Sequence, residues 1–178
     1  MRTDVLLEPW TDADLDIELR ANTPEMTRFL GGPEPEDAIR ARHERALALA
    51  VGGTGQMFRI ALSGAPGVGS VGYWEREWRG GTVYEMGWLV LAEYQGQGVA
   101  SAAVRLAAVH AANYGRHGYA HAYPKVAHAA SNAVCRKAGF ELLGEVDFEY
   151  PKGTPIRSCD WRLNLRALTD LEAGFPAT

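Results

Sequence analysis

The segment that decides the fold is VYEMGWLVLAEYQGQGVASAAVRL, which runs from Val83 to Leu106. Its first part, up to Leu91, is a nearly continuous apolar run rich in strand-forming residues, which predicts a buried strand. Gly96 and Gly98 follow one residue apart, and the alanine-rich stretch after them has high helix propensity. The segment therefore predicts a strand, a glycine turn and a helix.

A glycine turn that opens a helix is suited to binding an anion. The first backbone N–H groups of a helix have no partner within the helix, and the helix dipole adds partial positive charge at the same end. A pyrophosphate is a natural ligand for such groups. A side chain at position 96 or 98 would shield these groups and restrict the turn. Taken alone, the Gly-x-Gly pattern fits an ordinary helix start equally well.

The composition is that of a globular protein without a general affinity for nucleic acids. The chain has 178 residues, of which 47% are hydrophobic and 22% charged, and its formal net charge is −4. This length fits one domain with a sizeable core, and the negative charge does not attract phosphates. The N-terminal segment lacks the apolar core of a leader peptide, and no apolar run is long enough to span a membrane. We therefore expect a cytoplasmic protein with neither a nucleic-acid nor a membrane partner.

The spacing of cysteines and histidines predicts neither a disulfide framework nor a metal site. Cys135 and Cys159 are too few for such a framework and lack zinc-ligand spacing. Four histidines fall on different predicted elements, so we do not expect them to converge on one ion; they are His110, His117, His121 and His128.

Periodicity and turn residues predict the remaining elements. Predicted strands, besides the one at 83–91, span residues 5–7, 57–62, 68–74, 119–123, 140–148 and 156–165. Predicted helices span residues 11–20, 24–30, 35–51, 98–114 and 131–137, and residues 75–81 are expected to form a polar connection. This order predicts one mixed sheet with helices on both faces. We expect residues 1–167 to form a single domain and residues 168–178 a tail.

Two motifs in this order resemble the GCN5-related N-acetyltransferase (GNAT) superfamily, and within it the branch of ribosomal-protein N-terminal acetyltransferases. The superfamily pattern for the pyrophosphate loop is matched at every position by Gln95-Gly96-Gln97-Gly98-Val99-Ala100. The second signature is an asparagine, a serine three residues later and a final Lys-x-Gly-Phe; the chain has His128, Ser131 and Lys137-Ala138-Gly139-Phe140 there. Because the motifs lie on separate elements, the resemblance is far more specific than either motif alone, and it covers residues 3–165.

The resemblance implies an α/β protein with the GNAT fold, in which one mixed, mostly antiparallel sheet of about seven strands is splayed at the fourth strand. It implies direct transfer of an acetyl group from acetyl-CoA to an amine, on a peptide N-terminus or a small molecule, without a metal. Homodimers are common in such families. Pantetheine in this family lies beside the splayed strand, so the resemblance places the backbone of Leu89, Val90 and Leu91 against it. The same N–H groups can polarise the thioester carbonyl.

Glu85 is the predicted general base. A primary ammonium must lose a proton before it attacks, and Glu85 is a carboxylate in the middle of an apolar strand. Its position resembles that of a glutamate that many family members use as base. The alternative is that Glu85 lies on a solvated face or pairs with Arg59 or Arg76.

The proton donor for the leaving thiolate has two candidates. The wider superfamily has a tyrosine where this chain has Cys135, which could donate a proton or simply fill the core. Ser131 is the better candidate, because its branch places this hydroxyl near the coenzyme sulfur, although Ser131 and Asn132 are also good helix caps. His128 replaces an asparagine that usually bonds to pantetheine, and an imidazole can make the same bond.

The acceptor site is less marked in the sequence. The resemblance places Arg20, Asn22 and the turn at Phe29–Pro33 over the acceptor, and a second wall near Asp147, Glu149 and Tyr150. A group of aromatic residues could form core or an aromatic wall for a cationic acceptor; it comprises Trp74, Trp78, Trp88 and Tyr84. Two other functions stay open. The chain could be a catalytically weak acyl-CoA sensor or, less favourably because Ser101 replaces the third glycine, a dinucleotide-dependent oxidoreductase.

Overall fold

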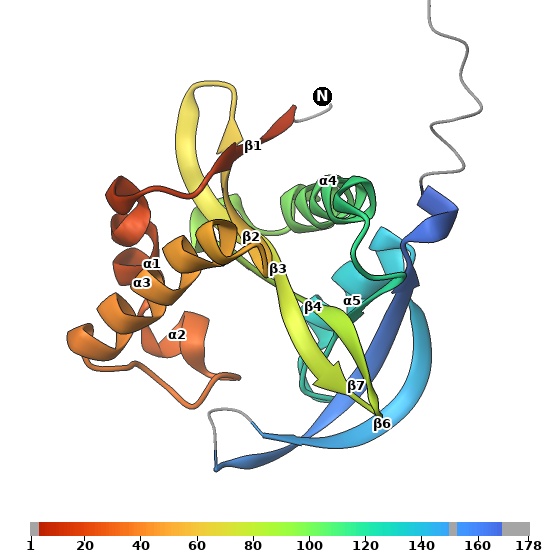
Figure 1. Cartoon of the computed structure of the whole chain (residues 1–178). Helices are drawn as coiled ribbons and strands as arrows, with labels where there is room; N and C mark the ends of the chain where they lie inside the picture. The colour runs from red at the N-terminus through yellow and green to blue at the C-terminus, as the bar shows by residue number, and fades with distance from the viewer. Residues whose placement is uncertain (1–3, 150–152, 169–178) are drawn as a thin grey trace, which may run out of the picture.

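In the computed structural model, which describes residues 4–149 and 153–168, seven strands form one sheet in the order β1-β2-β3-β4-β5-β7-β6 (Figure 1). The strands are β1 (Val5–Pro9), β2 (Gly55–Leu62), β3 (Ala65–Trp78), β4 (Gly81–Val90), β5 (Tyr119–Ala122), β6 (Glu141–Glu149) and β7 (Pro155–Asn164). Neighbouring strands are antiparallel except for β4 and β5, which are parallel. The predicted mixed, mostly antiparallel sheet is confirmed.

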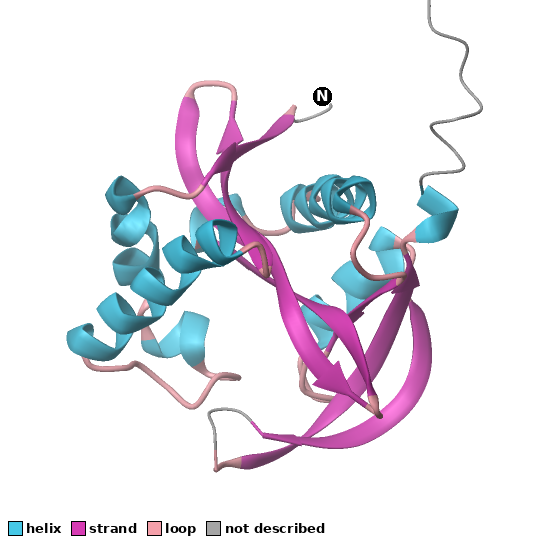
Figure 2. Ribbon diagram, in the orientation of Figure 1, coloured by secondary structure: helices cyan, strands magenta, loops and turns pink. Residues whose placement is uncertain are grey.

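Helices cover both faces of this sheet, as predicted (Figure 2). One group comprises the short turn η1 (Asp12–Asp14), α1 (Leu15–Ala21), α2 (Pro24–Thr27) and α3 (Glu36–Gly52), and the other comprises α4 (Val99–Tyr114) and α5 (Ala129–Ala138). A further short turn, η2 (Ala92–Tyr94), joins β4 to the glycine turn. Within the described ranges, no helix has both the length and the apolar character needed to cross a membrane.

The main core lies between α4 and the sheet. Alanines along α4, among them Ala103, Ala107 and Ala111, are fully buried, and their small side chains let the helix approach the strands closely. Tyr73 and Tyr84 from β3 and β4 fill the space beneath it, with ring centroids 4.7 Å apart in an edge-to-face arrangement. The core therefore fixes β4 and α4 relative to each other, and with them the turn that joins the two elements.

The predicted polar connection over residues 75–81 is wrong. Strand β3 continues to Trp78, β4 begins at Gly81, and the two pair along this whole stretch. The stretch is polar because its side chains interact across the hairpin, as Arg76 does with Glu85 and Thr82 with Glu77. Cross-strand pairs of this kind stabilise a strand that lacks an apolar face.

Two predicted helix boundaries also shift. The helix predicted over 24–30 ends at Thr27, whose hydroxyl donates to the Thr23 carbonyl at 2.6 Å. The helix predicted over 131–137 begins earlier, with His128 as its N-cap. At the C-terminus, Leu168 packs against the core; the other residues of the predicted tail, 169–178, lie outside the described residues.

The parallel strands β4 and β5 separate soon after they meet. Their pairing is limited to Tyr84 with Ala120 and Glu85 with His121, whereas β4 stays paired with β3 as far as Val90. Beyond Glu85, one edge of β4 therefore has no strand partner within residues 4–149 and 153–168. This is the predicted splay at the fourth strand.

Candidate functional site

The glycine turn before α4 has the backbone geometry of an anion cradle. Gly96 and Gly98 have φ angles of 74° and 82°, a region that favours glycine. A Cβ atom built on either would meet nothing within 4 Å, so the space above the turn is open. Among the hydrogen bonds of the described residues, none uses the backbone N–H groups of residues 96–101, and the first turn of α4 carries no acidic residue.

The other predicted loop residues support this cradle from below. The Gln95 side chain donates to the Val90 carbonyl at 2.8 Å, and the Gln97 side chain donates to the Glu93 carbonyl at 3.3 Å. Val99 is buried in the core, and Ala100 packs against it. These side chains fix the turn to the end of β4, and the backbone N–H groups of the turn remain without a partner among the described residues.

The free edge of β4 supplies further backbone groups. The Leu91 N–H donates to the Val68 carbonyl of β3 at 2.9 Å. Because hydrogen bonding alternates along an antiparallel pair, Leu89 also faces β3, whereas Trp88 and Val90 face the splay. Of the predicted strand residues Leu89, Val90 and Leu91, the structure therefore turns only Val90 to the open edge. Trp88 was missed, because the sequence does not fix the pairing register.

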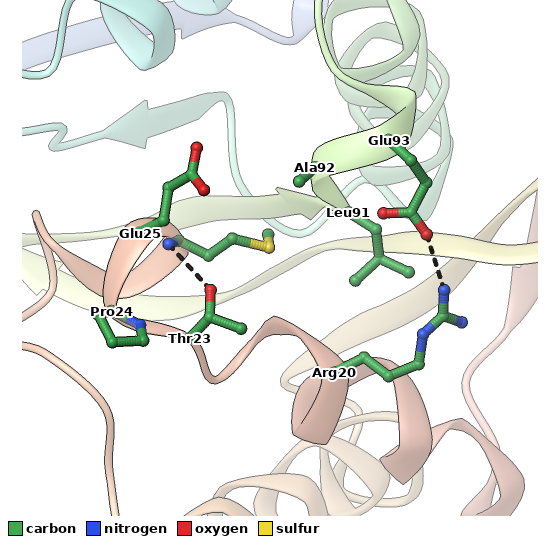
Figure 3. Close-up of a pocket in the computed structure, with 8 residues that line it drawn as sticks. Arg20, Thr23, Pro24, Glu25, Leu91, Ala92 and Glu93 are labelled. Atoms are coloured by element: carbon green, nitrogen blue, oxygen red, sulfur yellow. Dashed lines mark hydrogen bonds and ion pairs between the residues drawn. The ribbon is translucent and has the colours of Figure 1, made fainter.

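A cavity of about 480 Å³ lies beside the end of β4, between the α1–α2 segment and η2 (Figure 3). Leu91 and Ala92 line one side, and Thr23 to Met26 line the other. Across it, Arg20 pairs with Glu93 at 2.9 Å. Arg20, one of the residues predicted to contact the acceptor, lines this cavity; its contact with an acceptor stays a prediction.

The N-terminal end of α5 carries two of the predicted residues. The Ser131 hydroxyl lies 3.5 Å from Nε2 of His128, and the His128 ring is stacked on Phe29 with centroids 4.2 Å apart. Burial and the nearby charge of Arg28 lower the pKa of His128, so its ring is a neutral hydrogen-bonding group. Ser131 lies inside the helix, so the alternative that it caps α5 is wrong.

Asn132 does not cap α5 either, but it holds the loop before the helix. Its side-chain amide donates to the carbonyls of Lys125 and His128 at 3.0 and 2.9 Å, and its oxygen accepts the Trp161 indole N–H at 2.8 Å. Cys135, one turn further along, is fully buried, and burial raises the pKa of its thiol. Its environment is that of a core residue.

Glu85 lies on the face of the sheet opposite α4, and the structure pairs it with Arg76. The Arg76 guanidinium donates to Oε2 of Glu85 at 2.7 Å, and the Glu85 side chain is 15% exposed. Arg59, the other partner considered, instead binds Glu8 and Asp14. Glu85 is therefore an ion-paired carboxylate that remains partly accessible at the point where β4 and β5 separate.

Aromatic rings surround this ion pair. The Arg76 guanidinium lies over the rings of Phe148, Tyr123 and Trp78, at 4.3, 5.4 and 5.8 Å from their centroids. The Tyr123 hydroxyl is buried and has no hydrogen-bond partner within the described part of the chain. Burial and the charges of nearby carboxylates raise the pKa of Tyr123, so this hydroxyl is a protonated, unused donor. Sequence reasoning missed it.

A buried histidine–carboxylate pair lies beside Glu85 on the same face. Nδ1 of His121 is 2.7 Å from Oδ1 of Asp160, and Asp160 also accepts the Trp78 indole N–H at 3.2 Å. Burial raises the pKa of Asp160, but the His121 hydrogen bond and charge, with Trp78 and Arg79, outweigh it and the net pKa is lowered. Glu85 was identified because it is a carboxylate in the middle of a predicted strand. The same criterion applies to Asp160, which lies within the strand predicted over residues 156–165.

The other residues considered for the site have separate surroundings. His110 bonds to the Tyr73 hydroxyl at 2.8 Å and His117 to Glu75 at 2.9 Å. Across the described residues, no three histidines, cysteines or carboxylates gather as metal ligands would. Tyr84 belongs to the core, and Trp74 lies over Gly87.

Several predicted acceptor contacts are engaged elsewhere. Asn22 exchanges two hydrogen bonds with the backbone of Glu34, at 2.8 and 2.9 Å. Asp147 pairs with Arg157 at 3.1 Å, and Glu149 accepts the Gly153 N–H at 3.2 Å. Tyr150 lies outside the described residues.

Comparison with known proteins gives a family match. The model of the acetyltransferase (GNAT) domain family matches residues 4–141. No curated protein matches the chain significantly in sequence.

Solved structures of similar fold include several acetyltransferases. One, from Salmonella typhimurium, modifies the N-terminal serine of a 50S ribosomal subunit protein; it has 18% identity and a TM-score of 0.74, covering 92% of this chain and 96% of its own. An aminoglycoside acetyltransferase in complex with coenzyme A has 17% identity and a TM-score of 0.76, covering 96% of this chain and 100% of its own. The Microcin C7 self-immunity acetyltransferase, in complex with acetyl-CoA and AMP, has 15% identity and a TM-score of 0.72, with coverages of 90% and 92%.

Proposed function

The chain belongs to the GNAT acetyltransferase family, and on that premise we propose that it transfers an acetyl group from acetyl-CoA directly to a primary amine. The observation that carries the proposal is the open turn at Gly96 and Gly98, whose N–H groups have no partner among the described residues, at the end of β4 with its free edge. Coenzyme A fits this arrangement, since its pyrophosphate is an anion and its pantetheine amides can bond to a strand edge. Residues 1–167 form the catalytic domain in this proposal.

Backbone groups hold the coenzyme in this proposal. The N–H groups of residues 96–101 bind the pyrophosphate at the start of α4. Trp88 and Val90 present backbone groups to the pantetheine, and an N–H of this edge polarises the thioester carbonyl as negative charge develops on its oxygen. His128 and Ser131 flank the arm from α5. Gln95, Gln97, Val99 and Ala100 act indirectly, by fixing the turn, and Leu89 and Leu91 by holding β4 on β3.

Side chains handle the protons. Glu85 takes a proton from the ammonium of the acceptor, so that the amine can attack the thioester carbonyl. Ser131 donates a proton to the departing thiolate. Support for these roles is positional: Glu85 lies where β4 and β5 separate, and Ser131 lies in the first turn of α5 with its hydroxyl 3.5 Å from Nε2 of His128.

The acceptor is a peptide N-terminus or a small amine. Both kinds occur among the similar structures, where one protein modifies the N-terminal serine of a ribosomal protein and another is an aminoglycoside acetyltransferase. A cytoplasmic location, a homodimer and the lack of a nucleic-acid or membrane partner complete the proposal, in keeping with the net charge of −4.

An amine panel tests the proposal. The protein is incubated with acetyl-CoA and peptides with different first residues, polyamines or aminoglycosides, and free thiol release is followed against a control without amine. We expect at least one amine to raise thiol release well above that control. Binding of acetyl-CoA without turnover of any amine would favour the acyl-CoA sensor, which the buried Cys135 in place of a tyrosine supports. Binding of a nicotinamide dinucleotide instead would overturn both functions.

A further inference from the structure

His121 and Asp160 form a buried polar pair that the roles assigned so far do not use. His121 is 5% exposed and Asp160 is fully buried, on the middle strands β5 and β7. Asp160 has a lowered pKa and is ionised, and an ionised carboxylate only accepts hydrogen bonds. Nδ1 of His121 therefore carries the hydrogen and donates it to Oδ1 at 2.7 Å. This leaves Nε2 as a proton acceptor.

Nε2 of His121 is not used by the protein. Among the hydrogen bonds of residues 4–149 and 153–168, the His121 ring takes part in the one with Asp160 and in no other. Strand β5, which carries His121, lies between β4 and β7. Because Nδ1 of the His121 ring is bonded to Asp160 of β7, Nε2 is the ring nitrogen that remains available to a group on β4.

Glu85 is the group on the β4 side. It is the register partner of His121 in the parallel β4–β5 pair, so the two side chains share a face of the sheet and start from strands about 5 Å apart. This is also the last pair before the strands separate. Glu85 and His121 therefore occupy neighbouring positions on one face of the sheet at the mouth of the splay, with no direct hydrogen bond between them among those of the described residues.

We propose that His121, oriented by Asp160, receives the acceptor's proton from Glu85. The inference rests on the proposed acetyl transfer. An N–H bond of the ammonium breaks and an O–H bond forms on Glu85. That O–H bond then breaks as Glu85 gives its proton to a water molecule, and the water gives one of its own protons to Nε2, where an N–H bond forms. Asp160 stabilises the resulting imidazolium, which later releases the proton to water. Each turnover thus returns Glu85 to its ionised form beside Arg76.

The charges around His121 favour this role. Asp160 contributes a negative charge from β7, and Glu85 contributes another from β4, although the Arg76 guanidinium of β3 is paired with Glu85 at 2.7 Å and lies over the Tyr123 ring. The positive charge of Arg79, on the hairpin turn, is directed at Asp160 with an N–O distance of 3.5 Å. Arg162, the register partner of His121 on β7, is held by Glu141 at 3.0 Å and lies over the Tyr119 ring. On its own strand, His121 is stacked against the protonated Tyr123 ring.

The chain offers a matched control in the pair formed by His117 and Glu75. These residues also form a histidine–carboxylate contact, at 2.9 Å. Glu75 is opposite Tyr84 in the β3–β4 register, so this pair lies on the α4 face of the sheet, away from Glu85. A general effect of replacing a histidine should appear equally at His117.

The test compares pH–rate profiles of wild type, His121→Gln, Asp160→Asn and His117→Gln, with acetyl-CoA and the panel amine that turns over fastest. For His121→Gln we expect kcat to fall about 10-fold to 100-fold near pH 7.5, with loss of the limb in which the rate rises with pH. The KM for acetyl-CoA should stay within about twofold. Asp160→Asn should move that limb to lower pH, because the imidazolium loses a neighbouring negative charge. His117→Gln should keep the wild-type profile.

A second measurement on the unaltered protein does not depend on whether the variants fold. In protein labelled with ¹⁵N-histidine, His121 should carry its hydrogen on Nδ1, with Nε2 unprotonated, at pH values above the rising limb of the rate profile. Wild-type turnover with an unchanged limb in folded His121→Gln, or an Nε2–H form at pH values above that limb, would overturn the relay alone. If the protein instead binds acetyl-CoA but turns over no amine, the proposed acetyl transfer is wrong, and the relay that rests on it is wrong too.

Discussion

The glycine turn before α4 and the sheet face around Glu85 are built from different parts of the chain. The turn is contiguous, and its chemistry is that of backbone N–H groups freed by positive φ angles at Gly96 and Gly98. The face around Glu85 takes side chains from β3, β4, β5 and β7, among them Arg76, His121 and Asp160. A site made of backbone groups from one continuous segment can be predicted from the sequence of that segment. A site made of side chains from several strands depends on which strands become neighbours.

This difference predicts that variants of the two regions fail in different ways. A change at the face should slow turnover while coenzyme binding persists. A change at the turn should weaken coenzyme binding. The following variants test that separation.

Glu85→Gln should have the largest effect. Loss of the proton acceptor should lower kcat about 100-fold to 1,000-fold, while the KM for acetyl-CoA stays close to the wild-type value. Steady-state kinetics over a range of pH measure both. Glu145→Gln is the control, because Glu145 is likewise paired with an arginine, Arg157, but on the exposed strand β6. A Glu85→Gln protein with normal turnover and pH profile would remove Glu85 from the mechanism.

Gly98→Ala should come next and should affect binding. The added methyl group projects into the open space over the turn, so we expect the Kd for coenzyme A to rise about 30-fold, equivalent to about 2 kcal/mol. Titration calorimetry measures the change. Gly64→Ala is a close match, since Gly64 has a φ of 77° and an equally open Cβ position in the β2–β3 turn. Both variants should lose about 1 to 2 kcal/mol of stability, and equal loss of coenzyme affinity would contradict the assignment.

The same contrast explains what the sequence could predict. The strand–turn–helix unit and the splay follow from local pattern and family resemblance, and both are found in the structure. The hairpin end at residues 75–81 was misread because its polar residues satisfy one another across strands. His121 and Asp160 were not paired in advance because β5 and β7 are separated along the chain by α5 and β6, and their register arises only on folding.

Asn132→Ala should disturb the loop between β5 and α5. The Asn132 side chain holds the loop between β5 and α5 and accepts the indole N–H of the buried Trp161. Leaving these groups without a partner should cost about 1 to 3 kcal/mol of unfolding free energy, measured by urea unfolding. Asn113→Ala, at an exposed position on α4, should cost little. Equal stability of the two variants would show that Asn132 does not hold the loop.

The smallest expected effect concerns His128, the N-cap of α5. Burial and Arg28 lower the pKa of His128 in the folded protein, so below its ordinary pKa of about 6.5 the unfolded chain binds more protons than the folded one. Stability contributed by neutral His128 is therefore present at pH 7.5 and is lost as the pH falls through the folded value.

His128→Asn tests this by restoring the residue that the family signature has at this position. The variant loses the ring stacked on Phe29, and it should also lose part of the acid sensitivity. We expect the drop in unfolding free energy between pH 7.5 and 5.5 to be smaller than in wild type by up to about 1 kcal/mol, measured by urea unfolding at each pH. Burial also lowers the pKa of His110, but His110 is present in both proteins, so their difference isolates His128. An identical pH dependence of the two proteins would contradict the lowered pKa of His128, because it would mean that folding does not change the solvation of the ring.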